Sequence, residues 1–161
     1  MFSIAESITG GMIMSKITNI SGISNIFKGG IVCYSLDSKC ELLNTDHDYT
    51  HSCNGVSLNT VLQLVENICT KFKTNVGIAT TGYAEKHHDD DSQCYVAFKC
   101  FNSIEVWYIL NKDDKLFIQN LNTGQIRHIF RTKKLDRNEF RNYISEFVLK
   151  ILSKYYSMLK C

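Results

Sequence analysis

The chain has 161 residues, of which 44% are hydrophobic and 21% are charged, a balance typical of one globular domain with its own core. A formal net charge of +2 and a short basic cluster at 131–137 exclude a strongly basic nucleic-acid-binding protein. No apolar run approaches the ~18 residues of a membrane span, and the N-terminus lacks the pattern of a secretory signal. We therefore expect one cytoplasmic domain over residues 1–161, with no nucleic-acid or membrane partner.

Strands and helices are predicted to alternate in the first half of the chain. Ile13, Ile17 and Ile20 recur at helical spacing, and Ser57 is a plausible N-cap for a long amphipathic helix. The predicted elements, in order, are a strand at 2–6, a helix at 10–20, a strand at 27–35, a polar loop at 46–55, a helix at 57–73 and a strand at 76–80.

The second half is predicted to contain consecutive strands and a closing helix. A polar loop at 87–92 comes first, and later turn signals separate the strands. Asp136 and Glu139 have the spacing of a capping box at the start of the last helix. Alternating elements followed by an antiparallel run predict an α/β fold, a three-layer α/β/α sandwich with a mixed sheet. The predicted strands are 94–100, 104–110, 116–121 and 125–131.

Residues 5–11, with the sequence AESITGG, have the pattern of a strand end, a tight turn and a helix N-terminus. Backbone N–H groups and the helix dipole at such a place favour an anion. The same N–H groups can stabilise an oxyanion that forms beside a nucleophilic hydroxyl. Ser7 is therefore a candidate nucleophile.

Tyr34 and Lys39 are the side chains that could activate Ser7. Tyr34 ends a predicted strand and Lys39 follows five residues later, and residues at strand ends converge on one edge of an α/β sheet. A Ser–Lys pair can carry out acyl transfer if the lysine is desolvated enough to be neutral. A tyrosine hydroxyl can hold the serine or relay its proton. Composition alone leaves a chance grouping open, because Ser, Tyr and Lys are common.

The AESITGG stretch resembles the A-E-S-C-T-G-G motif of the CinA C-terminal domain family, the competence/damage-inducible proteins. Residues 27–35, FKGGIVCYS, are similar to that family's F-x-x-G-x-V-x-Y-S, and Lys39 matches the lysine of its Y-S-N-E-A-K. Asp136, Arg137 and Arg141 resemble the end of its G-D-R-x-x-V-R.

This resemblance implies a homo-oligomeric amidohydrolase that deamidates nicotinamide mononucleotide to nicotinate mononucleotide and ammonia, without a metal or other cofactor. Ser7 would attack the carboxamide carbon, Lys39 would be the general base, and Tyr34 would orient groups or relay the proton. The N–H groups near Gly10 would hold the oxyanion or the phosphate, and an arginine would suit the phosphate. A solvated first helical turn is the alternative for the arginines. The implied substrate-binding residues are Thr9, Gly10, Gly11, Thr81, Gly82, Arg137 and Arg141.

The resemblance breaks where the family has its glycine-rich loop, G-I-A-G-P-x-G-G. Residues 81–86, TGYAEK, stand there instead, and the bulky Tyr83 replaces small residues. This departure keeps a second hypothesis open: a catalytically impaired CinA-like module that serves binding or assembly.

Two histidine-containing stretches carry metal-ligand side chains at close spacing. They are His47-x-x-x-His51-x-Cys53 and the run His87-His88-Asp89-Asp90-Asp91. Neither has the paired spacing of a structural zinc site, so we interpret both as solvated polar loops and expect no metal. The seven cysteines include no C-x-x-C pair, which predicts reduced, mostly buried thiols.

Overall fold

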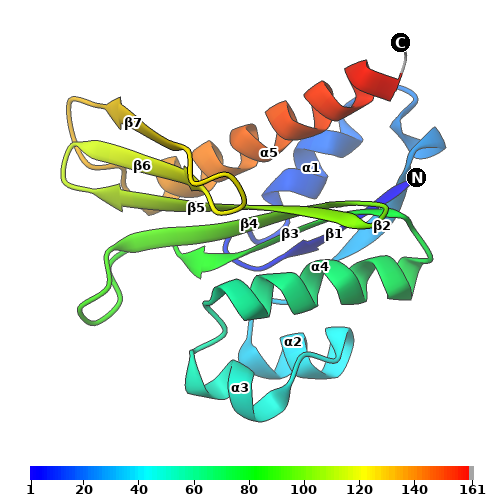
Figure 1. Ribbon diagram of the computed structural model, residues 1–161, viewed down its shortest axis with the longest axis horizontal. Coiled ribbons are helices and arrows are strands. Elements are labelled where there is room, and N and C mark those ends of the chain that lie inside the picture. The colour runs from blue at the N-terminus through cyan, green and yellow to red at the C-terminus, as the bar shows by residue number, and fades with distance from the viewer. Residues whose placement is uncertain (160–161) are drawn as a thin grey trace.

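The computed structural model describes residues 1–159, and its centre is a seven-stranded mixed sheet (Figure 1). The strand order is β2-β1-β3-β4-β5-β6-β7, in which β1 runs parallel to β2 and to β3 and every later pair is antiparallel. The strands are β1 Phe2–Glu6, β2 Phe27–Val32, β3 Val76–Tyr83, β4 Ser92–Cys100, β5 Ser103–Lys112, β6 Lys115–Asn120 and β7 Ile126–Phe130.

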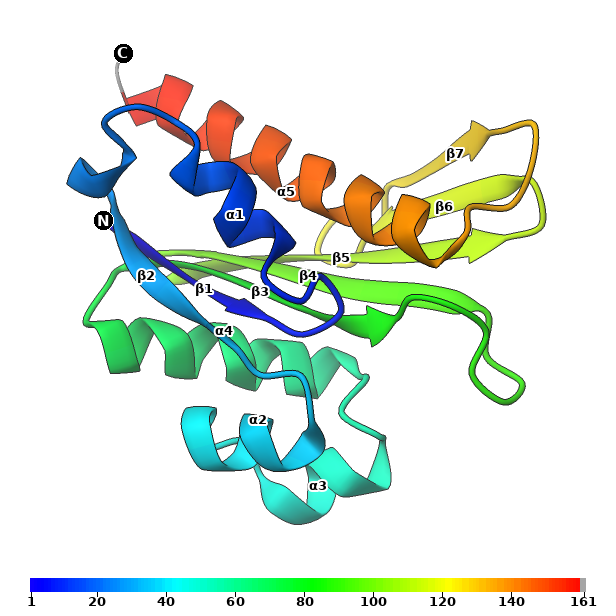
Figure 2. The same ribbon diagram turned by 180° about the vertical axis from the view of Figure 1, so that it is seen from behind.

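Helices cover both faces of the sheet, which confirms the predicted three-layer α/β/α arrangement (Figure 2). On one face lie α1 (Met12–Thr18) and the long α5 (Arg137–Leu159). On the other lies α4 (Leu58–Phe72), with α2 (Leu36–Leu43) and α3 (His47–Ser52) outside it. A short 3₁₀ turn, Ile23–Asn25, precedes β2.

The connections from β1 and β2 place the site. After β1 the chain passes through α1 on one face, and after β2 it passes through α2, α3 and α4 on the opposite face. Strand β1, which lies between β2 and β3, is therefore where the winding changes sides. In open α/β sheets the crevice at the carboxyl ends of such strands is where ligands bind.

Each face of the sheet packs an apolar core against its helices. Helix α4 buries Val61, Leu64, Val65 and Ile68 completely. The periodicity predicts three of these, Val61, Val65 and Ile68, on the core side, but it also predicts Leu58, which is 42% exposed. The other core joins β1 and the middle strands to α1 and α5. The sheet is thus packed on both faces, and this close packing fixes the positions of the strand ends.

Both predicted helix caps are confirmed. The Ser57 hydroxyl accepts a hydrogen bond from the N–H of Thr60 at 3.0 Å. Asp136 and Glu139 each accept from the other's backbone N–H at 2.9 Å. The prediction of a loop over 46–55 was wrong, because α3 lies within it. This six-residue helix is polar and has no apolar stripe to mark it.

No helix within residues 1–159 combines the length and the apolar character that crossing a bilayer requires.

Candidate active site

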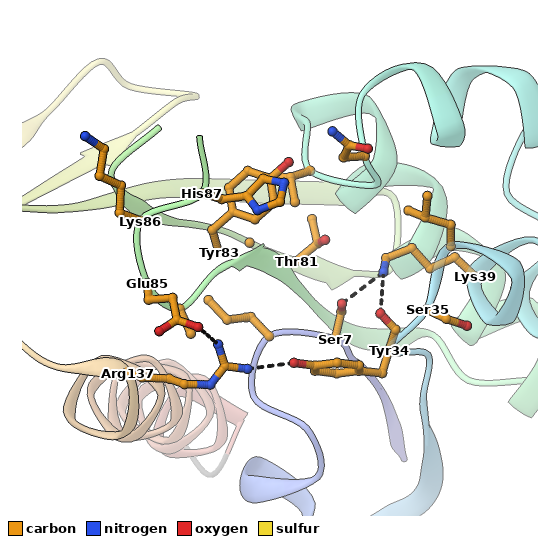
Figure 3. Close-up of a pocket in the computed structure, with 16 residues that line it drawn as sticks. Ser7, Tyr34, Ser35, Lys39, Thr81, Tyr83, Glu85, Lys86, His87 and Arg137 are labelled. Atoms are coloured by element: carbon orange, nitrogen blue, oxygen red, sulfur yellow. Dashed lines mark hydrogen bonds and ion pairs between the residues drawn. The ribbon is translucent and has the colours of Figure 1, made fainter. Parts of the chain in front are cut away.

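Ser7 and Lys39 meet at the carboxyl end of β1 (Figure 3). Lys39 Nζ donates a hydrogen bond to Ser7 Oγ at 3.0 Å and another to the Tyr34 carbonyl at 3.3 Å. Ser7 is 5% exposed and Lys39 is 3% exposed. The structure therefore brings together a hydroxyl and an amine that lie 32 residues apart in the chain.

The position of Lys39 depends on how α2 begins and on a neighbouring glycine. Ser35 caps α2 by accepting from the Ser38 N–H at 3.1 Å. A Cβ on Gly55 would lie 2.9 Å from Leu36 Cδ2 and 3.1 Å from Lys39 Cε, so a larger residue there would push against the lysine stem. Gly55 also has a φ of +65°, which favours glycine for a second reason.

Burial lowers the pKa of Lys39 from the usual lysine value. The amine is largely removed from bulk water, which disfavours its charged form. In the part of the chain that the structure describes, no carboxylate forms an ion pair with Lys39. Lys39 is therefore closer to a neutral base than a surface lysine is.

The N-terminus of α1 is filled by a side chain of the protein itself. The fully buried carboxylate of Glu6 accepts hydrogen bonds from the N–H groups of Gly11, Ile13 and Met14 at 2.7–3.1 Å. The N–H of Gly10 donates to the Ser7 carbonyl at 3.0 Å. We therefore do not assign a substrate anion to Gly10 and Gly11, because their N–H groups already have acceptors.

Arg141 supports the turn behind Ser7. Its Nε and Nη2 donate to the carbonyls of Ile8 and Thr9, both at 3.0 Å. A Cβ on Gly10, which has a φ of +57°, would lie 2.8 Å from Nη2, so a larger residue would displace the guanidinium. The Thr9 hydroxyl is hydrogen-bonded to that of Thr80 in β3 at 3.0 Å. Arg141 and Thr9 thus fix the backbone next to Ser7.

Arg137, the first residue of α5, lies at the mouth of the pocket (Figure 3). Its Nη2 donates to the Tyr34 hydroxyl at 2.8 Å, and its Nη1 donates to Glu85 Oε1 at 2.7 Å. Tyr34 is 57% exposed. Its carbonyl faces Lys39 while its hydroxyl faces Arg137, so the side chain belongs to the rim.

The pocket in front of Ser7 has a volume of about 450 Å³, within the usual range for small-ligand sites. Three of the predicted substrate-binding residues line it: Thr81, Gly82 and Arg137. The other four, Thr9, Gly10, Gly11 and Arg141, are not among its lining residues.

Several lining residues were not predicted. They include Asn54, Glu85 and His87, and the His87 ring stacks on Tyr83 with centroids 4.5 Å apart. The loop that departs from the family's glycine-rich pattern thus forms an aromatic and charged wall. Asn54 has a positive φ, directly before Gly55. No sequence signal marks it as part of a site.

The family model of the CinA C-terminal domain matches residues 1–132. The chain belongs to this family. A CinA-like protein of Flavobacterium psychrophilum is 34% identical over 154 residues, which are 94% of this chain and 34% of that protein. A CinA-like protein of Dictyoglomus turgidum is 37% identical over 82 residues, 51% of this chain and 20% of that one. The chain thus spans about a third or less of the length of these relatives.

Solved structures of CinA proteins share the fold. The competence/damage inducible protein CihA of Agrobacterium tumefaciens aligns with a TM-score of 0.68 at 24% identity, covering 96% of this chain and 84% of that one. A CinA superfamily protein of Enterobacter cloacae aligns with a TM-score of 0.71 at 18% identity, covering 96% and 80%. The mixed sheet and its two helical layers are therefore the CinA architecture.

Proposed function

We propose that this CinA-family domain is an amidase that hydrolyses the carboxamide of nicotinamide mononucleotide to nicotinate mononucleotide and ammonia. One observation carries the proposal. Lys39 Nζ lies 3.0 Å from Ser7 Oγ in a buried site that opens into a pocket lined by both residues. A nucleophile within hydrogen-bond reach of a desolvated base is the arrangement that acyl transfer requires.

In the proposed reaction, neutral Lys39 takes the proton of Ser7 as Oγ attacks the carboxamide carbon. The carbonyl oxygen becomes an oxyanion, and the backbone N–H of Ile8, which lines the pocket beside Ser7 and is not among the Glu6 contacts, would receive it. Lys39 then gives its proton to the leaving nitrogen, and ammonia departs. Water, deprotonated by the same amine, hydrolyses the ester and restores Ser7.

The rim supports a nucleotide as the substrate. Arg137 has a guanidinium suited to two-point binding of a phosphate, and Lys86 also lines the pocket. The stacked rings of Tyr83 and His87 offer an aromatic face for the pyridine ring. Tyr34 would support the phosphate contact through its hydrogen bond to Arg137.

The test is ammonia release from nicotinamide mononucleotide by the wild type, Ser7→Ala and Lys39→Ala. We expect turnover by the wild type alone, since each variant removes one half of the reacting pair. Lys99→Ala is the control, because Lys99 forms an ion pair with Glu66 on the surface of α4. Turnover that survives Ser7→Ala would contradict the mechanism.

The second hypothesis, a binding or assembly module, has a different outcome. Such a protein would bind the nucleotide in a calorimetric titration without releasing ammonia. The observation that favours it is the segment 81–86, TGYAEK, which replaces the family's glycine-rich loop and places Tyr83 and Glu85 in the lining of the pocket.

A further inference from the structure

Helices α2 and α3 place three metal-ligand side chains together on the outer layer of the fold, opposite α5 (Figure 1). Because α3 is a helix rather than a loop, His47 and His51 lie one turn apart on the same face. Asp37 comes from the first turn of α2. The grouping depends on the packing of α2 on α3 and is invisible in the sequence spacing.

The three side chains already face one another. The rings of His47 and His51 are stacked with centroids 4.3 Å apart, and His51 Nε2 lies 3.5 Å from Asp37 Oδ1. One ligand atom of each residue lies within 4.8 Å of the other two. Two ligands of a tetrahedral zinc ion, each about 2.0–2.1 Å from the metal, are about 3.4 Å apart. Small rotations of exposed side chains would close the difference.

We propose that Asp37, His47 and His51 bind a divalent transition-metal ion of the zinc class. Two imidazoles and one carboxylate are a donor set that such ions favour over Mg²⁺ or Ca²⁺. The side chains are 72%, 68% and 39% exposed in the order Asp37, His47, His51. A fourth coordination position therefore faces water.

The charged residues around Asp37, His47 and His51 are mostly acidic and therefore favour a cation. Residues 36–54 contain the acids Asp37, Glu41, Asp46 and Asp48 and a single lysine, and that lysine, Lys39, directs its amine at Ser7. The His47 Nδ1 lies 3.2 Å from Asp48 Oδ1. A carboxylate on one ring nitrogen is the usual outer support of a metal-binding histidine.

The helix that carries both histidines is anchored. Asp46 caps α3 by accepting from the Tyr49 N–H at 2.7 Å, and its own N–H donates to Gln63 of α4 at 2.7 Å. A bound ion would join α2 to this anchored helix. Lys39 sits on α2, so the ion would hold the wall of the pocket that carries the base.

Few other side chains could bind the metal ion in place of this cluster. Cys53, close in sequence, has its Sγ within hydrogen-bond reach of the Ser57 and Thr60 hydroxyls, toward α4. Across residues 1–159 no other three His, Cys, Asp or Glu side chains come this close together. The histidines of the 87–91 loop therefore do not form a second such group.

The test is metal binding by the untagged protein, measured with Zn²⁺ against a chromophoric chelator and with Co²⁺ by absorption. We expect one ion per chain, a Co²⁺ spectrum without thiolate charge-transfer bands, and a melting temperature that rises with Zn²⁺ but not with Mg²⁺. His51→Gln and Asp37→Asn should each weaken binding tenfold or more. His128→Gln, on β7, is the matched control and should bind like the wild type.

Both mutated side chains of the cluster, Asp37 and His51, are exposed, so the two variants should melt at the wild-type temperature without metal. Unchanged Zn²⁺ affinity in His51→Gln, or a thiolate band in the Co²⁺ spectrum, would overturn the proposal. No binding by the wild type would overturn it as well. None of these readouts uses ammonia release, so the proposal stands or fails apart from the amidase function.

Discussion

The floor and the rim of the pocket differ in how deeply their side chains are buried and in what holds them in place. The floor, Ser7 and Lys39, is buried to 5% exposure or less and is held by strand ends and a capped helix. The rim, Tyr34, Glu85 and Arg137, consists of long exposed side chains joined by a hydrogen bond and an ion pair. Exposed pairs of this kind contribute little to stability.

Under the proposed function, this difference assigns the chemical step to the buried floor and substrate binding to the exposed rim. A buried amine has a lowered pKa because it is largely removed from bulk water, whereas exposed side chains can exchange partners when a ligand arrives. We therefore expect substitutions in the floor to change the rate of the chemical step and substitutions in the rim to change substrate affinity.

The largest effect is expected from Lys39→Met, which keeps the length of the side chain and removes the base. kcat/KM should fall roughly 10³-fold, while the melting temperature should rise, because a buried amine is replaced by an apolar group. Ammonia release and thermal unfolding measure the two effects. Lys99→Met is the control, and activity within tenfold of the wild type would mean that Lys39 is not the base.

The pH dependence of the rate should report the titration of Lys39 in the floor of the pocket. Because burial lowers the pKa of Lys39 from the usual lysine value of 10.5, the rate should rise with pH as the amine loses its proton, with a midpoint below 10.5. Below the midpoint, kcat/KM should fall about tenfold per pH unit. Lys39→Arg keeps its charge and should be inactive throughout. A wild-type rate that shows no rise with pH at any point below 10.5 would argue against a titrating base.

Arg137→Gln should act on the rim alone. Losing a charge-assisted contact to phosphate should raise KM for the mononucleotide about tenfold or more and leave kcat within about threefold. The riboside, which lacks the phosphate, should be processed equally by both proteins. Equal losses on both substrates would place the role of Arg137 elsewhere.

The smallest effect is expected from Glu85→Gln. Removing this partner frees Arg137 for the ligand, and an exposed ion pair is worth at most about 1 kcal/mol, so KM should fall about twofold or stay unchanged. Initial rates at low substrate concentration measure it. A large rise in KM would show that Glu85 contacts the substrate itself.

What could be predicted from the sequence was mostly local. The caps at Ser57 and Asp136 follow from side chain-to-backbone contacts within three residues, and the α4 stripe follows from periodicity. Ser7 and Lys39 could be paired because strand ends converge and because the motif resembles a family. Helix α3 was missed because its stability comes from a cap and from contacts with α2 and α4 rather than from an apolar pattern.

The rim could not be predicted, because its contacts are set by where α5 lies. Arg137 and Tyr34 are 103 residues apart, and Arg137 and Arg141 occupy neighbouring turns of one helix. One arginine reaches the pocket and the other reaches the carbonyls of Ile8 and Thr9. The sequence pattern contains nothing that distinguishes the two.

Glu6 has a consequence for how substrate preference can change in this domain. Its carboxylate occupies the helix end where many α/β proteins seat a phosphate, so under the proposed function the phosphate would be recognised by side chains alone. Single substitutions at positions such as 85 or 137 could then alter the accepted amide without disturbing Ser7, Lys39 or the sheet. Because Glu6 occupies the backbone N–H groups at the start of α1, the choice of ligand would depend on side chains and not on the backbone.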